Sequence, residues 1–293
     1  MKTNHSQAPA PSSRPAYAPP VSAYAAQADG NFLSSQLTRG PWHPDHQHAG
    51  PPIALVCRFI ERAGLEHGLS HLSRLTANLL RPVPVGMLSV QVQADYVGRN
   101  TGHFSAQLLA NGKEIGRFTA LMQRETDVPL PAPEHPLPAH PPAPEQSVPV
   151  GMSITVNAGP AHHFSDGQPS YAQLVETRTA RGVCWQGPCA IWFRMRHPLL
   201  DTEPTSVYQR VAVAADSGNG VSATLDFVDY TFVNSDLTIN LLRRPRGEWI
   251  CLDAHTLFGP SGSGLAESML FDEHGIIGRA TQNLLVRKRD GGK

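Results

Sequence analysis

The chain has 293 residues, and its 24 Lys plus Arg residues are balanced by 24 Asp plus Glu residues. This length allows a sizeable core and two domains. Zero net charge excludes the broad electric field that would draw the protein to nucleic acid or to an anionic membrane. No apolar run approaches the roughly 20 residues of a membrane span, and the N-terminus lacks the apolar segment of a secretory signal. Four scattered cysteines fit reduced, buried thiols, so a cytoplasmic protein is expected.

The N-terminal part of the chain predicts a tail, a helix and a group of strands. Residues 1–30 are rich in Pro, Ala, Ser and Gln without apolar periodicity, which predicts a disordered tail. Ordered structure is expected from Asn31, with a strand over FLSSQL. Pro51 and Pro52 suit a first helical turn, and apolar residues then recur at helical spacing up to a terminating Gly64. Strands are expected beyond that helix, at 72–81, 87–97, 103–111 and 114–124.

The C-terminal part repeats this order after a linker. Residues 126–149 are dense in proline, which predicts a semi-rigid spacer between residues 31–125 and 150–289. Beyond it we expect an early strand within 152–164, a strand or hairpin within 174–196 and a series of strands over 232–289. A helix is expected from about Ser206 to Ser217, with Thr205 as its N-cap and Gly218 as its stop.

An internal repeat relates the two parts. LTANLLRP at 75–82 corresponds to LTINLLRRP at 237–245, and NGKEIGRFTAL at 111–121 corresponds to EHGIIGRATQNL at 273–284. The spacing between these anchors differs by about one residue, which indicates a diverged duplication. One helix followed by a meander of strands, twice over, predicts an α+β architecture in which each antiparallel sheet wraps one central helix.

The two copies differ where chemistry is expected. Three positions are polar in the second copy and inert or opposite in charge in the first. They are Asp236, Thr256 and Gln282, which correspond to Arg74, Ala94 and Ala120. This asymmetry places the candidate functional residues in the second copy.

Three motifs resemble a known family. HAGPPIAL at 48–55, SDLTINLLRRP at 235–245 and RATQNLLVRKR at 279–289 are similar, in order and spacing, to motifs of double-hotdog acyl-CoA thioesterases of the thioesterase II-like family. The resemblance implies a tandem hotdog, with residues 31–125 as one hotdog and 150–289 as the other. It also implies an acyl-CoA substrate, hydrolysis without a cofactor and a role in lipid metabolism.

By this resemblance, Asp236, Thr256 and Gln282 hold and activate the hydrolytic water. The residues agree in part. Strand alternation makes Gln282 the single polar side chain on an otherwise apolar face, and it turns Thr256 inward. Alternation turns Asp236 outward, unless a bulge at residues 234–235 re-aims it. For the hydroxyl, Ser261 and Ser263 remain alternatives to Thr256.

The start of the first predicted helix completes the expected site. A helix N-terminus offers backbone N–H groups to an oxyanion. Because Pro51 and Pro52 have no N–H, the expected donor is Gly50, and after it Ile53, with His48 beside the substrate.

The histidines near the start of this helix allow other interpretations of the site. His43, His46 and His48 with Asp45 are typical of plain loop residues, so no metal is expected. A first rival is a hotdog enoyl-thioester hydratase or dehydratase that uses His48 with a carboxylate across the interface, although Asp45 lies three residues before His48 rather than five. A second rival is a non-catalytic module that binds acyl-thioesters. A homo-oligomer also stays open.

Overall fold

The computed structural model describes residues 21–131, 136–151 and 168–289. The strand expected within 152–164 and most of the predicted tail lie outside these residues. Residues 21–30 of that tail are ordered, because Tyr24 is fully buried and its hydroxyl donates to Gln47 Oε1 at 2.6 Å. No helix within the described ranges is long and apolar enough to cross a membrane.

The strands follow the expected order along the chain. In the N-terminal part they are β1 (Tyr24–Ala26), β2 (Phe32–Ser34), β3 (His71–Leu79), β4 (Met87–Val97), β5 (Thr101–Ala110) and β6 (Lys113–Gln123). In the C-terminal part they are β7 (Val148–Val150), β8 (Val175–Arg181), β9 (Cys189–Met195), β10 (Tyr230–Asn234), β11 (Asp236–Leu241), β12 (Ile250–Phe258), β13 (Ser263–Asp272) and β14 (Gly275–Lys288).

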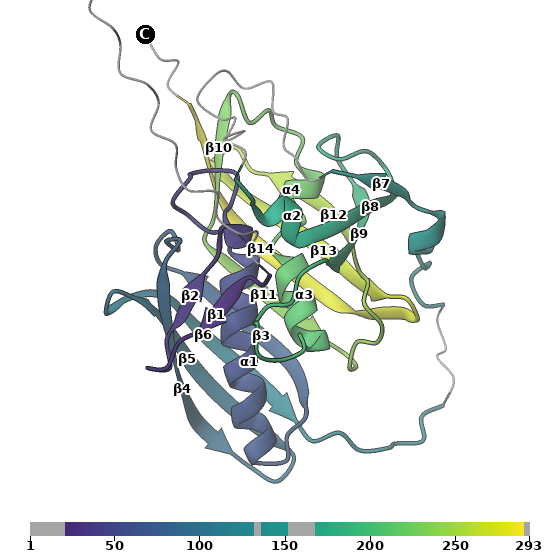
Figure 1. Cartoon of the computed structure of the whole chain (residues 1–293). Coiled ribbons are helices and arrows are strands. Elements are labelled where there is room, and N and C mark those ends of the chain that lie inside the picture. Colours follow the sequence, from purple (N-terminus) through teal and green to yellow (C-terminus); the bar gives the residue numbers. More distant parts are fainter. Residues whose placement is uncertain (1–20, 132–135, 152–167, 290–293) are drawn as a thin grey trace, which may run out of the picture.

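These strands form one antiparallel sheet rather than two separate ones (Figure 1). Its order within the described residues is β1-β2-β4-β5-β6-β3-β11-β14-β13-β12-β9-β8-β7, and β10 pairs with β14. The junction is β3 against β11, where Thr76 lies opposite Thr238 and the Thr238 hydroxyl donates to that of Thr76 at 3.2 Å. These threonines are equivalent in the internal repeat, so the two repeated segments join the sheet by pairing with each other.

Part of the predicted linker is also built into the sheet. β7 pairs with β8, and a 3-10 helix, η2 (Pro144–Gln146), precedes it. The indole N–H of the buried Trp192 donates to the carbonyl of Pro142 at 2.7 Å. The last residues of the proline-rich stretch therefore pack on the C-terminal part instead of spacing the two parts.

The long helix is α1 (Gly50–Glu66), which has prolines in its first turn as expected. It does not end at Gly64. That glycine is buried inside the helix, where an added Cβ would lie 2.7 Å from the side chain of Met122 and 2.9 Å from the carbonyl of Leu69. The helix ends at Glu66 with His67 as its C-cap, and Gly68 follows with a φ of +69° that suits glycine.

The second central helix, α3 (Val207–Ala215), begins one residue later than predicted. Ser206, not Thr205, is the N-cap, and its side chain exchanges capping-box hydrogen bonds with Gln209. The hydroxyl of Thr205 instead accepts the N–H of Leu199 at 2.8 Å. The described part of the chain also contains the short helices η1 (Gln36–Thr38), α2 (Tyr171–Leu174) and α4 (Gly218–Ser222).

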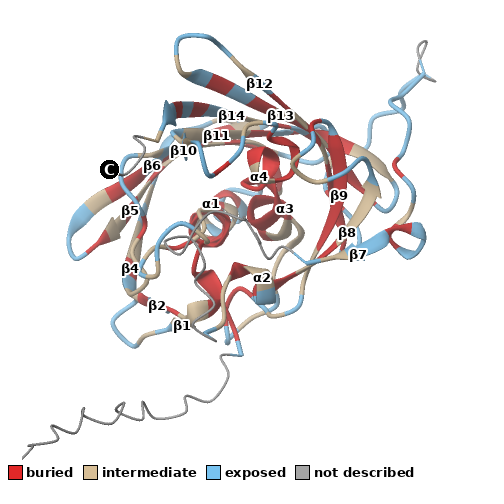
Figure 2. Ribbon diagram, turned by 90° about the horizontal axis from the view of Figure 1, so that it is seen from above, coloured by how far each residue is buried: buried red, intermediate tan, exposed pale blue. Residues whose placement is uncertain are grey.

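The sheet curves around α1, α3 and α4, whose buried faces form the centre of the molecule (Figure 2). α1 and α3 run antiparallel. The start of α1 touches the end of α3, because a Cβ on Gly50 would lie 2.5 Å from the carbonyl oxygen of Val213. Glycine is therefore required at position 50 for the two backbones to approach this closely.

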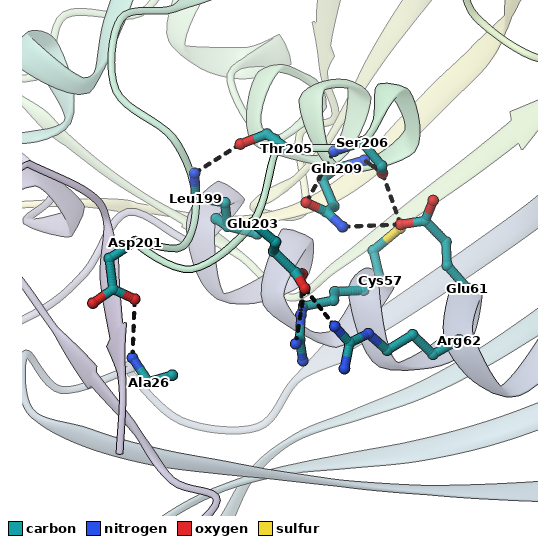
Figure 3. Close-up of polar contacts among 11 residues, drawn as sticks. Ala26, Cys57, Glu61, Arg62, Leu199, Asp201, Glu203, Thr205, Ser206 and Gln209 are labelled. Carbon is teal, nitrogen blue, oxygen red and sulfur yellow. Dashed lines mark hydrogen bonds and ion pairs between the residues drawn. The ribbon is translucent and has the colours of Figure 1, made fainter. Parts of the chain in front are cut away.

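At its other end, α1 meets the start of α3 through Glu61 (Figure 3). The Glu61 carboxylate accepts the Ser206 hydroxyl at 2.8 Å and the Gln209 amide at 3.2 Å. The Cys57 thiol lies 3.8 Å away on the same helix. Burial raises the pKa of Glu61, an effect that the bonds from Ser206 and Gln209 partly offset.

This raised pKa predicts a pH-dependent stability. In the folded protein Glu61 keeps its proton in a pH range where the unfolded chain has released it. Its contribution is therefore fully present below the unfolded pKa of about 4.3 and is lost as pH rises through the folded pKa. We expect Glu61→Gln to match the wild type near pH 4 and to exceed its stability increasingly at higher pH, measured as urea midpoints. Glu66→Gln, on the exposed end of the same helix, should follow the wild type at every pH.

Candidate functional site

The polar centre of the molecule is Asp216, directly after α3 and 5% exposed. Its Oδ1 accepts the Gln282 amide at 3.1 Å and the Asn234 amide at 3.0 Å. Its Oδ2 accepts the N–H of Gly50 at 3.1 Å and lies 3.0 Å from Nδ1 of His48. Three hydrogen bonds and the His48 contact therefore involve both oxygens of this carboxylate.

His48 joins the N-terminal part of the chain to this carboxylate. Its ring stacks on Tyr171 at 3.8 Å with a 2° interplanar angle, and the Tyr171 hydroxyl donates to the carbonyl of Val213 at 2.8 Å. His48 Nδ1 lies 3.0 Å from Asp216 Oδ2 and accepts the Gly50 N–H at 3.2 Å, and these neighbours fix the orientation of the ring. Its Nε2 makes no hydrogen bond to the described residues, and the side chain is 12% exposed toward the cavity described below.

Burial acts on both members of this pair. It lowers the pKa of His48, an effect that the nearby Asp216 charge partly offsets, and it raises the pKa of Asp216, which the His48 interaction and the donated hydrogen bonds partly offset. His48 is consequently neutral at neutral pH, and its free nitrogen can accept a proton.

Gln282 points inward, as strand alternation predicts, and is 1% exposed. Its Nε2 donates to the backbone carbonyl of Asp216 at 2.9 Å as well as to the carboxylate, and its Oε1 accepts the N–H of Asn219 at 3.2 Å. Gln282 thus spans the turn between α3 and α4. All of its hydrogen-bonding atoms hold this turn in place.

Thr256 is also turned inward, at 8% exposure. Its hydroxyl lies 2.8 Å from that of Ser222, which donates in turn to the carbonyl of Gly218 at 2.9 Å. Thr256 therefore fastens the far end of α4 from strand β12. The alternatives Ser261 and Ser263 are exposed at the turn between β12 and β13, 3.4 Å from each other and away from this network.

Asp236 lies on the opposite face of the sheet from Gln282, as strand alternation predicts, and no bulge turns it toward the site that the family resemblance implies. Its carboxylate accepts the backbone N–H of Asn283 at 2.7 Å and the Asn283 amide at 3.1 Å. Strand residues alternate in direction, so the neighbour of an inward Gln282 points outward and holds Asp236 there. The break at Ser235 turns Asn234, not Asp236, toward the site.

The expected backbone donors of α1 are engaged as well. The Gly50 N–H reaches Asp216 and also lies 3.2 Å from Nδ1 of His48. The Ile53 N–H donates to the carbonyl of Ala49 at 3.1 Å, and its side chain is fully buried. Ile53 is therefore part of the helix core, and Gly50 orients the His48–Asp216 pair instead of facing an open space.

A cavity of about 810 Å³ opens above this pair. Its floor includes His48, Asp216, Asn219 and Tyr171, which are buried or nearly so, whereas Trp42 and Leu80 at its mouth are 46% and 47% exposed. Thr256 and Gln282 lie behind the floor and do not line the cavity.

The charged side chains that line this cavity are mostly positive. Asp216 is the one carboxylate among the described residues that line it, and three arginines line it too: Arg39, Arg81 and Arg289. His43 and His46 stack on each other at 4.2 Å near the mouth. Across the described ranges, no three His, Cys, Asp or Glu side chains are grouped as they would be around a metal ion.

Sequence reasoning missed Asp216, although the chain carries a signal for it. The residue follows the apolar run VAVAA at the C-terminal end of a predicted helix. The helix dipole disfavours a negative charge at that end. A buried carboxylate at this end of an apolar helix therefore requires hydrogen-bond donors from other parts of the chain.

Similar solved structures define the fold. A conserved protein of unknown function with a hot dog fold from Alicyclobacillus acidocaldarius superposes with a TM-score of 0.63 at 16% identity, over 89% of this chain and 93% of that chain. The tesB protein of Mycobacterium avium subs paratuberculosis gives 0.63 at 15% identity, over 88% and 92%. An acyl-CoA thioesterase II from Mycobacterium marinum gives 0.52 at 16%, over 76% and 83%. The chain has the hotdog fold.

The family follows from the sequence match. Residues 38–123 match the acyl-CoA thioesterase N-terminal domain, and residues 140–286 match the acyl-CoA thioesterase C-terminal domain. The chain belongs to the acyl-CoA thioesterase family. Comparison with curated proteins gives no match to this sequence.

The buried hydrogen bonds of Gln282 predict that its replacement destabilises the protein more than replacement of the adjacent Asn283. Gln282→Ala leaves the Asp216 carbonyl and the Asn219 N–H without their partner in a buried place, so we expect it to lower the free energy of unfolding by about 1–3 kcal/mol. Asn283→Ala removes exposed contacts to Asp236, which water can replace, and should cost less. Urea denaturation of both variants tests this, and equal losses would contradict the arrangement.

Proposed function

We propose that the protein hydrolyses acyl-CoA thioesters to a free acid and coenzyme A. The observation that carries the proposal is the buried His48–Asp216 pair at the floor of a cavity rich in cationic side chains. Membership of the acyl-CoA thioesterase family supports the same substrate class.

The reaction needs a base that reaches the attacking water. Asp216 accepts hydrogen bonds from Gln282, Asn234 and Gly50 and lies against His48, so we assign it to orient and stabilise a His48 ring that carries its proton on Nδ1, instead of taking the proton itself. The free Nε2 of His48 accepts a proton from water, whose oxygen adds to the thioester carbonyl carbon. The carbon–sulfur bond then breaks, and the imidazolium returns the proton to the leaving sulfur. The products are a carboxylic acid and the free thiol.

Gln282 and Thr256 are positioning residues in this proposal. Gln282 fixes the Asp216 carboxylate and Thr256 fixes α4, so both hold the floor of the site without touching substrate. Asp236 has no part in the chemistry, because its carboxylate is bound on the other face of the sheet.

The substrate would lie between the two parts of the chain. We propose that residues 31–125 and 150–289 are two hotdog units, the first supplying His48 and the second Asp216. Arg81 and Arg289 line the cavity and are suited to the phosphates of coenzyme A. The acyl group would occupy the apolar part of the wall, which includes Leu79 and Phe232.

Three variants test these roles. We expect His48→Gln to lower kcat/KM by roughly 10²–10⁴-fold, as removal of a general base does. Asp216→Asn should be comparably impaired, because an amide cannot stabilise the imidazolium. Thiol release from a panel of acyl-CoAs measures both. Asp236→Asn is the matched control and should turn over like the wild type; an inactive Asp236→Asn with an active Asp216→Asn would reverse the assignment.

The pH dependence offers an independent check. If His48 is the base, kcat/KM falls as pH drops through the pKa of His48 in the free enzyme. Burial places that pKa below its usual 6.5, so activity should persist somewhat below pH 6.5 before it declines. The acid limb should vanish in the residual activity of His48→Gln. An unchanged limb would assign the base elsewhere.

One observation favours a second candidate, an enoyl-thioester hydratase or dehydratase. His48 faces a carboxylate supplied by the other part of the chain, which is the pairing that such a reaction requires. Incubation with enoyl-CoA separates the two: loss of the enoyl absorbance without free thiol supports hydration, and thiol release supports hydrolysis. Tight acyl-CoA binding with neither outcome would indicate a binding module.

A further inference from the structure

Two of the four cysteines lie close together, away from the proposed catalytic pair. Cys184 and Cys189 stand in the stretch CWQGPC, at the connection between β8 and β9. Cys184 is partly buried and Cys189 is 1% exposed, and both side chains pack in the same hydrophobic core. Neither takes part in the proposed reaction, so this pair of thiols has no assigned role.

The backbone brings the two cysteines together. The strands β8 and β9 are paired, and a Cβ on Gly182 would lie 3.1 Å from the Cα of Cys189, so the two ends of the loop touch. Within the loop, Trp185 has a φ of +64°, in the left-handed region that residues other than glycine seldom adopt. This conformation turns the chain back on itself and leaves Cys184 against the first residue of β9.

The side chains of Cys184 and Cys189 share a hydrogen bond, which lowers the pKa of Cys189 against the effect of burial and raises the pKa of Cys184. Burial instead raises the pKa of Cys57 in α1 and of Cys251 in β12. The thiolate is the form of cysteine that reacts with oxidants. Cys189 is therefore the thiol best prepared to react, and Cys184 is the neighbour that can complete a disulfide.

We propose that Cys184 and Cys189 are a modification site at which hydrogen peroxide converts the two thiols reversibly into a disulfide. One sulfur, as its thiolate, attacks a peroxide oxygen and becomes a sulfenic acid, while the other oxygen takes up a proton and leaves as water. The second sulfur then attacks the sulfenic sulfur, and hydroxide leaves with the remaining thiol proton as a second water. The pair loses two electrons and the peroxide gains them, and a dithiol reductant restores both thiols.

The thiol pair lies in the loop that supports α4. Trp185, which follows Cys184, donates its backbone N–H to the carbonyl of Val221 at 3.2 Å and its indole N–H to the carbonyl of Gly220. Gly220 lines the cavity, so the disulfide would form directly behind the wall of the candidate site. Disulfide formation is measured chemically, and its outcome is therefore independent of the proposed hydrolysis.

Peptide mapping of the wild-type protein tests the proposal. The folded protein is treated with hydrogen peroxide, unfolded, alkylated and cleaved with trypsin, which releases both cysteines on one peptide, residues 182–194. We expect this peptide to lose two hydrogen atoms and to carry no alkyl group, while the free thiols per chain fall from four to two. Treatment with dithiothreitol before alkylation should restore all four.

Cysteine variants identify the partners. Cys184→Ser and Cys189→Ser should each abolish the loss of two hydrogen atoms, whereas Cys57→Ala, which removes a buried thiol of α1, should form the disulfide like the wild type. A peptide 182–194 that still takes up two alkyl groups after oxidation would overturn the proposal, as would a disulfide to Cys251 or between two chains. The mapping uses the wild type, so a variant that does not fold leaves the test decisive.

Discussion

The structure depends on the antiparallel contact of α1 with α3. The carbonyl oxygen of Val213 occupies the space that a side chain at position 50 would need, so the helix ends approach at backbone distance. This approach brings the Gly50 N–H and the His48 ring, from one part of the chain, onto the Asp216 carboxylate of the other. Residues 166 positions apart thereby form one site. A bulkier residue at 50 would separate the helices and the pair together.

The same contact explains how two carboxylates are tolerated inside the molecule. Asp216 lies at the C-terminal end of α3, where the dipole of its own helix opposes a negative charge, and Glu61 lies in the C-terminal half of α1. Each faces the N-terminal end of the other helix, where donors are available: Gly50 for Asp216, and the Ser206 cap for Glu61. Antiparallel packing thus offsets an unfavourable position on one helix with a favourable one on its neighbour.

Sequence patterns predicted the local structure well, because strand and helix periodicity is a local property. The strands β3 to β6 lie within two residues of their expected ranges, whereas the strand expected over FLSSQL ends at Ser34 and β1 and β7 lie in segments expected to be tail and linker. Alternation correctly turned Gln282 and Thr256 inward and Asp236 outward. The resemblance to the family assigned Asp236 to the site, although alternation turned its side chain outward. Asp216 was missed because its partners come from α1, β10 and β14, and no periodicity specifies which helix end packs on which strand. The pairing of β3 with β11, which merges two expected sheets into one, has the same non-local origin.

The repeat also explains why a doubled chain has a single candidate site. Thr76 and Thr238, equivalent in the repeat, lie opposite each other at the centre of the sheet, so each helix end in one part has a counterpart in the other. At the Asp216 end, Asn219 and Gly220 of α4 line a cavity. At the Glu61 end, Ser206 and Gln209 bind the carboxylate directly, and Arg58 and Arg62 close the adjacent surface by pairing with Glu203. After the inferred duplication, the contact of Glu61 with the start of α3 has therefore become structural. The contact of Asp216 with the start of α1 borders a cavity that can hold a ligand.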